Sequence, residues 1–441
     1  MNRRTCHSVP FAPVPAAILV AALLVILAAP LAASADAGVS AVRYWTAPDH
    51  TRIVVDLTEY ASYSTSVRTE PDRVVVLIVG GSIDGAATAT PVGDGLVDRV
   101  RINQLSSGAQ VVVDLTSASA HTVFPLKPYM HKPHRVVIDV FRDRLPEAHS
   151  PTMAPERQAA RPRVVVIDPG HGGEDPGTLG NGELREKDIV LDMGMRLAAL
   201  LRQRGYQVHM TRDGDYFVRL RKRQEMARQW DGDLFVSIHA NSAPNKKADG
   251  TEIFFVSPRG ASDQAARELA DRENAADLVG GVSPDADDDV LSVLVDLKMN
   301  DSVAKSDDLA GLMKEELERD RCSDTAVKQA GFVVLKSLAM PSILVEVGFL
   351  TNRGDVKKLK RSEYRQDYVD CMAKAVDRYF ERYTQAPVLA NAGSTHKVAP
   401  GETLWSIARR YEISVDELRA WNGLDVTSTI RVDQVLTVGR S

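Results

Sequence analysis

The hydrophobic pattern that follows the N-terminus predicts short β-strands. Between residues 39 and 141, β-branched runs recur at 52–58, 73–79, 110–116 and 135–139. The first and third runs share the sequence Val-Val-Asp-Leu-Thr, and the second and fourth share Arg-Val-Val, which indicates a duplicated pair of strands. Because no catalytic constellation accompanies these strands, the segment predicts a small β-sandwich that serves binding or targeting.

From residue 163 to residue 383 the pattern changes to strands that alternate with amphipathic helices. Residues 164–168 form a continuous apolar run, typical of a strand buried on both faces, and apolar positions at helical spacing predict a helix over 188–204. The other expected elements are strands at 206–211, 234–238, 252–256, 332–335 and 343–347, and helices at 219–230, about 262–320 and 362–383. This alternation predicts an α/β domain with a mostly parallel sheet that is covered on both faces.

Segments without a period separate these domains. Residues 142–162 and 384–394 are expected linkers, and residues 395–439 form a third, small domain. At the N-terminus, two arginines precede an apolar run at 16–29 and an Ala-Ser-Ala site at 33–35. This is the pattern of a secretory signal peptide, cleaved near Ala35, and the run is too short to favour a membrane span. We therefore expect an exported protein without a stable membrane span.

The composition sets further limits. A length of 441 residues predicts two to four domains, and 44% hydrophobic residues exclude a largely disordered chain. The net charge of −5, which becomes −7 if residues 1–35 are removed, argues against a nucleic-acid partner. Cys6 lies in the expected signal peptide, which leaves Cys322 and Cys371. Export would permit these two to pair, and the sequence leaves their pairing open.

Candidate chemistry lies at the ends of three expected strands. His171 follows the first in Asp-Pro-Gly-His-Gly-Gly, His239 ends the strand at 234–238, and Glu346 ends the strand at 343–347. Glu186 lies just before a helix, on the loop nearest His171. Two imidazoles and one carboxylate are a standard ligand set for catalytic Zn²⁺, which activates water for amide hydrolysis. A further carboxylate, Glu346, could then accept the proton of that water.

Each of these residues alone has a simpler explanation. A histidine near a strand end is usually a hydrogen-bonded structural residue, and Glu186 and Glu346 are by default solvated acids. The glycine-rich loop could bind an anion, but no Lys-Ser/Thr follows it, and Pro169 and Pro176 remove two amide donors. Their joint placement predicts a metal hydrolase without fixing its substrate.

The four motifs, in this order, resemble those of the zinc-dependent N-acetylmuramoyl-L-alanine amidases of the periplasmic cell-division type. The resemblance covers about half of the chain, with no departure at the four positions. It implies that His171, Glu186 and His239 bind zinc and that Glu346 is the catalytic carboxylate. The implied reaction cleaves the amide between N-acetylmuramic acid and L-alanine of the peptidoglycan stem peptide, for cell separation and wall turnover. The alternatives are another zinc-dependent wall hydrolase (a peptidase or deacetylase) and a non-catalytic peptidoglycan-binding protein.

The flanking domains resemble modules that accompany this enzyme. The duplicated β-module is similar to the AMIN domain, which implies attachment to the cell wall. Residues 395–439, which contain His-Lys-Val-Ala-Pro-Gly-Glu-Thr-Leu-Trp, resemble a LysM module of βααβ fold, which implies binding of N-acetylglucosamine-containing glycans. Trp405 and Trp421 are candidate glycan contacts, although packing in the core of so small a fold explains them equally well.

A long insert separates the second and third strand-end motifs. It spans about 260–320, more than one crossover requires, and a surface loop with packing helices would explain it. The resemblance to cell-division amidases implies instead an inhibitory helix, with an acid in the open zinc position until a periplasmic activator with a LytM-type domain binds. The sequence does not single out that acid. The candidates are Glu273, Asp287, Asp288 and Asp289.

Overall fold

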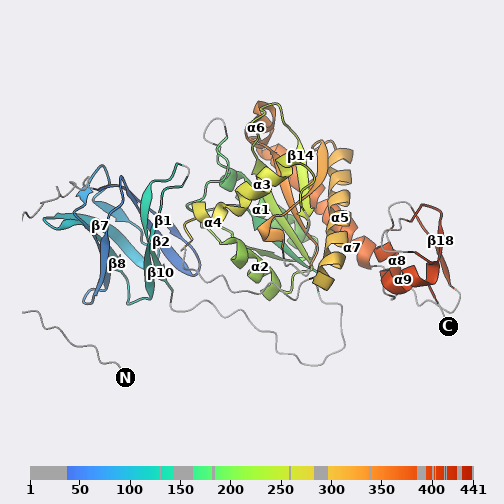
Figure 1. Cartoon of the computed structure of the whole chain (residues 1–441), viewed down its shortest axis with the longest axis horizontal. Helices are drawn as coiled ribbons and strands as arrows, with labels where there is room; N and C mark the ends of the chain where they lie inside the picture. Colours follow the sequence, from blue (N-terminus) through green and yellow to red (C-terminus); the bar gives the residue numbers. More distant parts are fainter. Residues whose placement is uncertain are drawn as a thin grey trace, which may run out of the picture.

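The computed structural model describes residues 37–129, 131–142, 162–180, 184–257, 260–282, 296–336, 340–384, 394–399, 402, 404–411, 413, 415–424 and 430–439. Figure 1 shows an N-terminal β-domain, a central α/β domain and a small C-terminal module. The expected signal peptide, most of both linkers, and Asp287, Asp288 and Asp289 lie outside the described residues. Within the described ranges, no helix combines the length and apolarity that a membrane crossing needs.

The N-terminal domain is the predicted sandwich, built of two five-stranded sheets with the orders β5-β1-β2-β10-β9 and β3-β4-β8-β7-β6. The strands are β1 (Gly38–Thr46), β2 (His50–Leu57), β3 (Tyr63–Arg68), β4 (Arg73–Val79), β5 (Ser82–Ile83), β6 (Ala89–Pro91), β7 (Val97–Leu105), β8 (Gly108–Leu115), β9 (His121–Leu126) and β10 (His134–Phe141). The two Val-Val-Asp-Leu-Thr runs fall in β2 and β8, the middle strand of each sheet. Alternate residues of these strands form the core between the sheets.

The central domain is built on a six-stranded sheet with the order β12-β11-β13-β16-β14-β15. Its strands are β11 (Val164–Pro169), β12 (Gln207–Met210), β13 (Leu234–Asn241), β14 (Thr251–Val256), β15 (Thr325–Ala330) and β16 (Ser342–Phe349). The first four strands of the sheet, β12, β11, β13 and β16, run parallel. Only the pairing of β14 with β16 is antiparallel, which confirms the predicted mostly parallel sheet.

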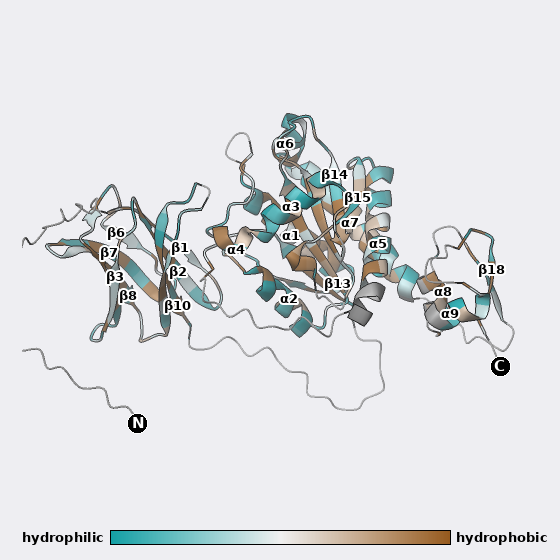
Figure 2. Cartoon of the chain, in the orientation of Figure 1, coloured by the Kyte–Doolittle hydropathy of each residue, from teal (hydrophilic) through white to brown (hydrophobic). Residues whose placement is uncertain are grey.

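Helices cover both faces of this sheet. Apolar residues of α1, α5 and α7 pack on one face, and those of α2 and α3 pack on the other. The helices are α1 (Glu186–Gln203), α2 (Leu220–Gln229), α3 (Gln264–Asn274), α4 (Ala276–Val279), α5 (Asp296–Arg319), α6 (Arg353–Leu359) and α7 (Ser362–Thr384). Figure 2 shows hydrophobic strands at the centre of the domain and hydrophilic surfaces on helices such as α2, α3 and α6.

One strand prediction was wrong. The apolar run expected as a strand at 332–335 contains a short 3-10 helix, Val333–Leu335, and the edge strand β15 lies just before it. The run is apolar because Phe332, Val334 and Leu335 fill the core under α2 and α3. The edge strand was not predicted because its sequence, Thr-Ala-Val-Lys-Gln-Ala, contains few large apolar residues.

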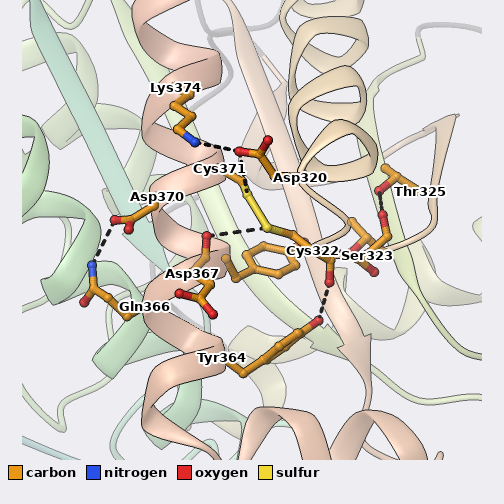
Figure 3. Close-up of a disulfide and its surroundings, with 12 residues drawn as sticks. Asp320, Cys322, Ser323, Thr325, Tyr364, Gln366, Asp367, Asp370, Cys371 and Lys374 are labelled. Carbon is orange, nitrogen blue, oxygen red and sulfur yellow. Dashed lines mark hydrogen bonds and ion pairs between the residues drawn. A yellow bond between two sulfur atoms is a disulfide. The ribbon is translucent and has the colours of Figure 1, made fainter.

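Cys322 and Cys371 form a disulfide, which answers the question that the sequence left open. Cys322 follows α5 and Cys371 lies in α7, so the bond joins the two helices of one layer (Figure 3). Around it, Lys374 pairs with Asp320 at 2.6 Å, and the hydroxyl of Tyr364 donates to the carbonyl of Cys322 at 2.9 Å.

The C-terminal module has the predicted βααβ order. It consists of β17 (Thr395–Lys397), α8 (Leu404–Arg410), α9 (Val415–Asn422) and β18 (Val435–Thr437), and the two strands pair antiparallel. Its core contains Ile407, Leu418 and Leu436. Trp421 in α9 is partly buried and is not among the described members of that core, and Trp405 lies in α8 with its side chain outside the described part.

Candidate metal centre

The loop after β11 carries His171 at the carboxyl end of a central parallel strand. His171 has a positive φ of 58°, and the loop bends so tightly that glycine is required beside it. A Cβ atom on Gly170 would lie 2.3 Å from the ring of His239, and one on Gly177 would lie 2.6 Å from Glu186 Oε2. The glycines of the first motif therefore let the two histidines and Glu186 approach one another.

Two buried arginines hold this loop in place through hydrogen bonds. Arg223 donates to Asp168 Oδ1 at 2.9 Å and to the carbonyl of His171 at 2.8 Å. Arg212 donates to the carbonyls of Pro169 at 3.0 Å and Gly170 at 2.6 Å. Sequence reasoning missed both arginines, because an arginine in a polar helix or loop gives no signal that its guanidinium is buried.

His171 is oriented by a carboxylate. Its Nδ1 lies 2.7 Å from Asp175 Oδ2, which leaves Nε2 to face the other candidate ligands. Carboxylates commonly hold the second nitrogen of a metal-binding histidine in this way. Asp175 lies two residues beyond the glycines of the first motif, and the sequence alone assigns it no role.

Glu186, the first residue of α1, reaches both histidines. Its Oε1 lies 3.0 Å from His171 Nε2 and 3.1 Å from His239 Nδ1. The same oxygen accepts a 2.8 Å hydrogen bond from the backbone N–H of Ala240, and Oε2 accepts one from Thr178. The structure therefore brings together the three residues that the sequence singled out as candidate ligands.

A fourth ligand atom comes from the insert. Glu273, in α3, places its Oε2 3.2 Å from His171 Nε2 and 3.4 Å from His239 Nδ1. The ligand atoms of His171, His239 and Glu273 all lie within 4.8 Å of one another. Of the four acids considered from the sequence, Glu273 is therefore the one that the described structure places at this centre.

These side chains suit a metal ion such as Zn²⁺. His171 Nε2 and Glu273 Oε2 are buried and, despite their proximity, make no hydrogen bond with each other or with another described residue. Buried polar atoms are rarely left without a partner, and two imidazoles with carboxylate oxygens are the donor set that zinc prefers. The cavity beside them has a volume of about 10 Å³, about the space that one water requires.

The charges at the centre are strongly coupled. Burial alone would lower the pKa of His171, but Asp175, Glu186 and Glu273 outweigh it and raise that pKa well above its usual value. In the same way, the hydrogen bond to Glu186 and the nearby carboxylate of Glu273 outweigh burial and raise the pKa of His239 to about 9. The histidines in turn lower the pKa of Glu186 to about 2 and that of Glu273 well below its usual value, against the effect of burial.

Glu346 lies beside this group but differs from it. On β16 it is the register partner of His239 on β13, and it is 1% exposed. Neither of its carboxylate oxygens has a hydrogen-bond partner among the described residues. Burial raises the pKa of Glu346 well above its usual value, and the charges of Glu186 and Glu273 add to this effect. Such a carboxyl group suits proton transfer more than ion pairing.

The chain also resembles known proteins over all three units. Residues 165–378 match the N-acetylmuramoyl-L-alanine amidase family, residues 41–140 match the AMIN domain and residues 396–439 match the LysM domain. The sequence is 32% identical over 372 residues to the N-acetylmuramoyl-L-alanine amidase AmiC of Escherichia coli O6:H1, which covers 78% of this chain and 89% of the relative. It is 40% identical over 220 residues to AmiA of Escherichia coli K12, over 49% of this chain and 76% of the relative.

A solved structure, the amidase AmiC2 of Nostoc punctiforme, is 31% identical and covers 50% of this chain and 97% of that chain, with a TM-score of 0.37. The alignment with AmiC of Escherichia coli O6:H1 covers 89% of that relative at 32% identity, and so spans more than one domain of this chain. The chain therefore belongs to the family of N-acetylmuramoyl-L-alanine amidases.

Proposed function

We propose that this chain is a zinc-dependent peptidoglycan hydrolase that cleaves the amide between N-acetylmuramic acid and L-alanine of the stem peptide. The observation that carries the proposal is the convergence of His171 Nε2, His239 Nδ1 and Glu186 Oε1, in which the glutamate oxygen lies 3.0 and 3.1 Å from the two nitrogens. Zinc held by these three residues supplies a water of pKa about 7 and polarises the amide carbonyl.

Side chains of this protein orient the zinc ligands and transfer the protons of the reaction. Asp175 fixes the ring of His171 so that Nε2 is available as a ligand. Glu346 accepts a proton from the attacking water and returns it to the amine of the departing L-alanine. Its burial beside His239 keeps its pKa raised, which favours both acceptance and return of that proton near neutral pH.

Glu273 makes this form of the enzyme inactive. Its carboxylate lies within 3.4 Å of both histidines, where the catalytic water and the substrate carbonyl must bind. Activity therefore requires that α3 move away, and a periplasmic activator with a LytM-type domain is the partner that the resemblance to cell-division amidases favours.

The flanking units place the enzyme on its substrate. A LysM module and an AMIN domain both favour attachment to the cell wall, and a wall substrate requires export to the periplasm. The pattern at residues 1–35 supports this route. Trp421 is half-buried and lies outside the described core of the module, which leaves it a candidate glycan contact. Together, these units support a role in wall turnover and cell separation.

The test is the chemistry of the products. Purified peptidoglycan is digested with the full chain and analysed by mass spectrometry, with and without a chelator. We expect free stem peptides that begin with L-alanine, no release after chelation, and recovery when zinc is added back. The His171→Ala variant should bind less zinc and release no peptide. Products cut within the stem peptide, release of acetate, or full hydrolysis by His171→Ala would contradict the proposal.

A further inference from the structure

The outer face of the first sheet of the N-terminal sandwich is buried, although such a face normally meets water. Along β2 and β10, Ile53 and Ile138 point into the sandwich core. The neighbouring residues on the opposite face, Val54 and Val137, are 1% and 0% exposed and pack with Leu126 in a separate cluster. Because this cluster lies outside the sandwich core, another part of the chain must cover it.

The covering part is the segment that follows the blocking helix. Arg52 of β2 donates to the carbonyl of Gly280 at 2.5 Å, and Arg135 of β10 donates to the carbonyl of Val279 at 3.4 Å. A Cβ atom on Gly281 would lie 3.0 Å from Leu126 Cδ1, so the backbone itself rests on the sheet. Figure 1 accordingly shows α4 beside β2 and β10.

A second contact reaches the loop of the metal centre. Glu174, next to Asp175, is 2% exposed, and its cationic partners come from the N-terminal domain. Lys132 Nζ lies 2.9 Å from Glu174 Oε1, Arg135 Nη1 lies 3.2 Å from it, and Arg43 also pairs with this carboxylate. A buried carboxylate needs such partners, so the loop and the sandwich are held together by charge.

We infer that the outer face of β1, β2 and β10 is a docking surface for the chain's own central domain, and that it holds α3 and α4 in the position where Glu273 blocks the metal centre. The surface that it meets consists of Glu174 on the loop of the metal centre and the carbonyls of Val279 and Gly280 at the end of α4. Withdrawal of α3 would break the contacts at Val279 and Gly280, so docking favours the blocked state. By reciprocity, release of Glu273 would weaken docking. The regulatory part of this inference rests on the proposed function.

The second sheet of the sandwich provides an internal comparison. Arg101 binds Asp114 through Nε and Nη2, the same two-point pairing that Arg43 makes with Asp56. Asp56 and Asp114 lie in the two Val-Val-Asp-Leu-Thr runs, and both pairs span the same sequence separation of 13 residues. Arg101 keeps 35% of its side chain exposed, whereas the cations that contact Glu174 are Arg43 of β1, Lys132 of the loop before β10, and Arg135 of β10. Arg101→Ala is therefore a matched control.

The experiment uses the full, zinc-loaded chain and the double variant Arg43→Ala/Lys132→Ala. Both side chains are partly exposed, at 30% and 15%, so the sandwich should still fold. Wall hydrolysis is measured without an activator, in the parent chain and in a Glu273→Ala background. Amide hydrogen exchange of residues 276–282 is measured in parallel, and thermal unfolding checks that each variant is folded.

We expect the double variant to speed exchange in 276–282 and to raise hydrolysis about fivefold or more, the usual range of coupling between sites. In the Glu273→Ala background it should add nothing, and Arg101→Ala should change neither quantity. If Glu273→Ala raises hydrolysis but the folded double variant behaves like Arg101→Ala, the docking inference is wrong and the proposed block stands. If Glu273→Ala has no effect, the proposed block is wrong. In that case amide hydrogen exchange alone tests the docking surface. Unchanged exchange of residues 276–282 in the double variant would show that the docking inference is wrong.

Discussion

At the scale of single residues, the centre separates two kinds of carboxylate. Glu186 and Glu273 share the histidines as partners and stay ionised, with pKa values below the usual range. Glu346 has no hydrogen-bond partner among the described residues, and its burial raises its pKa. When the surroundings shift the pKa values of neighbouring carboxyl groups in opposite directions, the groups suit different roles. Here the ionised carboxylates suit metal binding, and the carboxyl group with the raised pKa suits proton transfer.

This division predicts the effect of Glu346→Gln. The change keeps the shape of the side chain and removes its ability to carry a proton, so turnover should fall about 10²- to 10⁴-fold, the usual contribution of general acid–base catalysis. Zinc content, measured on the same samples, should not change. Glu252→Gln is a suitable control, because Glu252 is the register partner of Glu346 on β14 but pairs with Lys328. An equal loss in both variants, or loss of zinc from Glu346→Gln, would contradict the assignment.

Four residues of the centre could be predicted because each lies at the end of a strand or the start of a helix, positions that a sequence pattern locates. They are His171, Glu186, His239 and Glu346. Glu174, Arg212 and Arg223 could not be predicted in the same way. Their importance comes from burial by segments far away in the sequence, and an isolated acid or arginine is by default a surface residue. Glu273 was one of four candidate acids, and only the packing of α3 against the sheet distinguishes it.

At the scale of elements, the helix layer of α1, α5 and α7 is a separate structural unit from the blocking helix. The disulfide ties α5 to α7 through Cys322 and Cys371 (Figure 3). On the other face, α3 is held by Asn274, whose side chain accepts from the N–H of Val333 at 2.7 Å. In the next turn, Asp277 accepts from the N–H of Leu220 at 3.0 Å. Non-covalent contacts thus keep the blocking segment in place, whereas a covalent bond secures the opposite layer.

Loss of the disulfide should lower stability without changing the chemistry. We expect Cys322→Ser to reduce the free energy of unfolding by about 2–4 kcal/mol, because the bond closes a long loop in the unfolded chain. Denaturant unfolding of the variant and of the wild type with a reductant should give the same value. Equal stability of the oxidised and reduced wild-type chains would show that the bond does not contribute.

The order of elements could be predicted from hydrophobic periodicity because most strands of the central sheet are long apolar runs. The exception is informative. β15 lies at the edge and is only partly buried, so its residues do not form such a run. The apolar residues next to it fill a core position from a 3-10 helix, and periodicity alone does not distinguish these two situations.

At the scale of the whole molecule, the three units have different relations to the metal centre. The central domain supplies the residues of the centre, and the C-terminal module folds around its own small core. The N-terminal domain contacts both the loop of His171 and the end of α4. This contact could not be predicted, because an arginine in a strand is by default a surface residue, and nothing in the sequence shows which segment covers it.

The central claim is that Glu273 blocks a zinc amidase. The most direct test compares the activator-free release of L-alanyl stem peptides by the wild-type chain, Glu273→Ala and Glu268→Ala, each loaded with zinc. Glu268 lies on the same helix but is exposed, so its variant controls for a change in α3 itself. The account predicts release about fivefold or more faster for Glu273→Ala and no change for Glu268→Ala. Equal rates for all three folded, zinc-loaded proteins would contradict it.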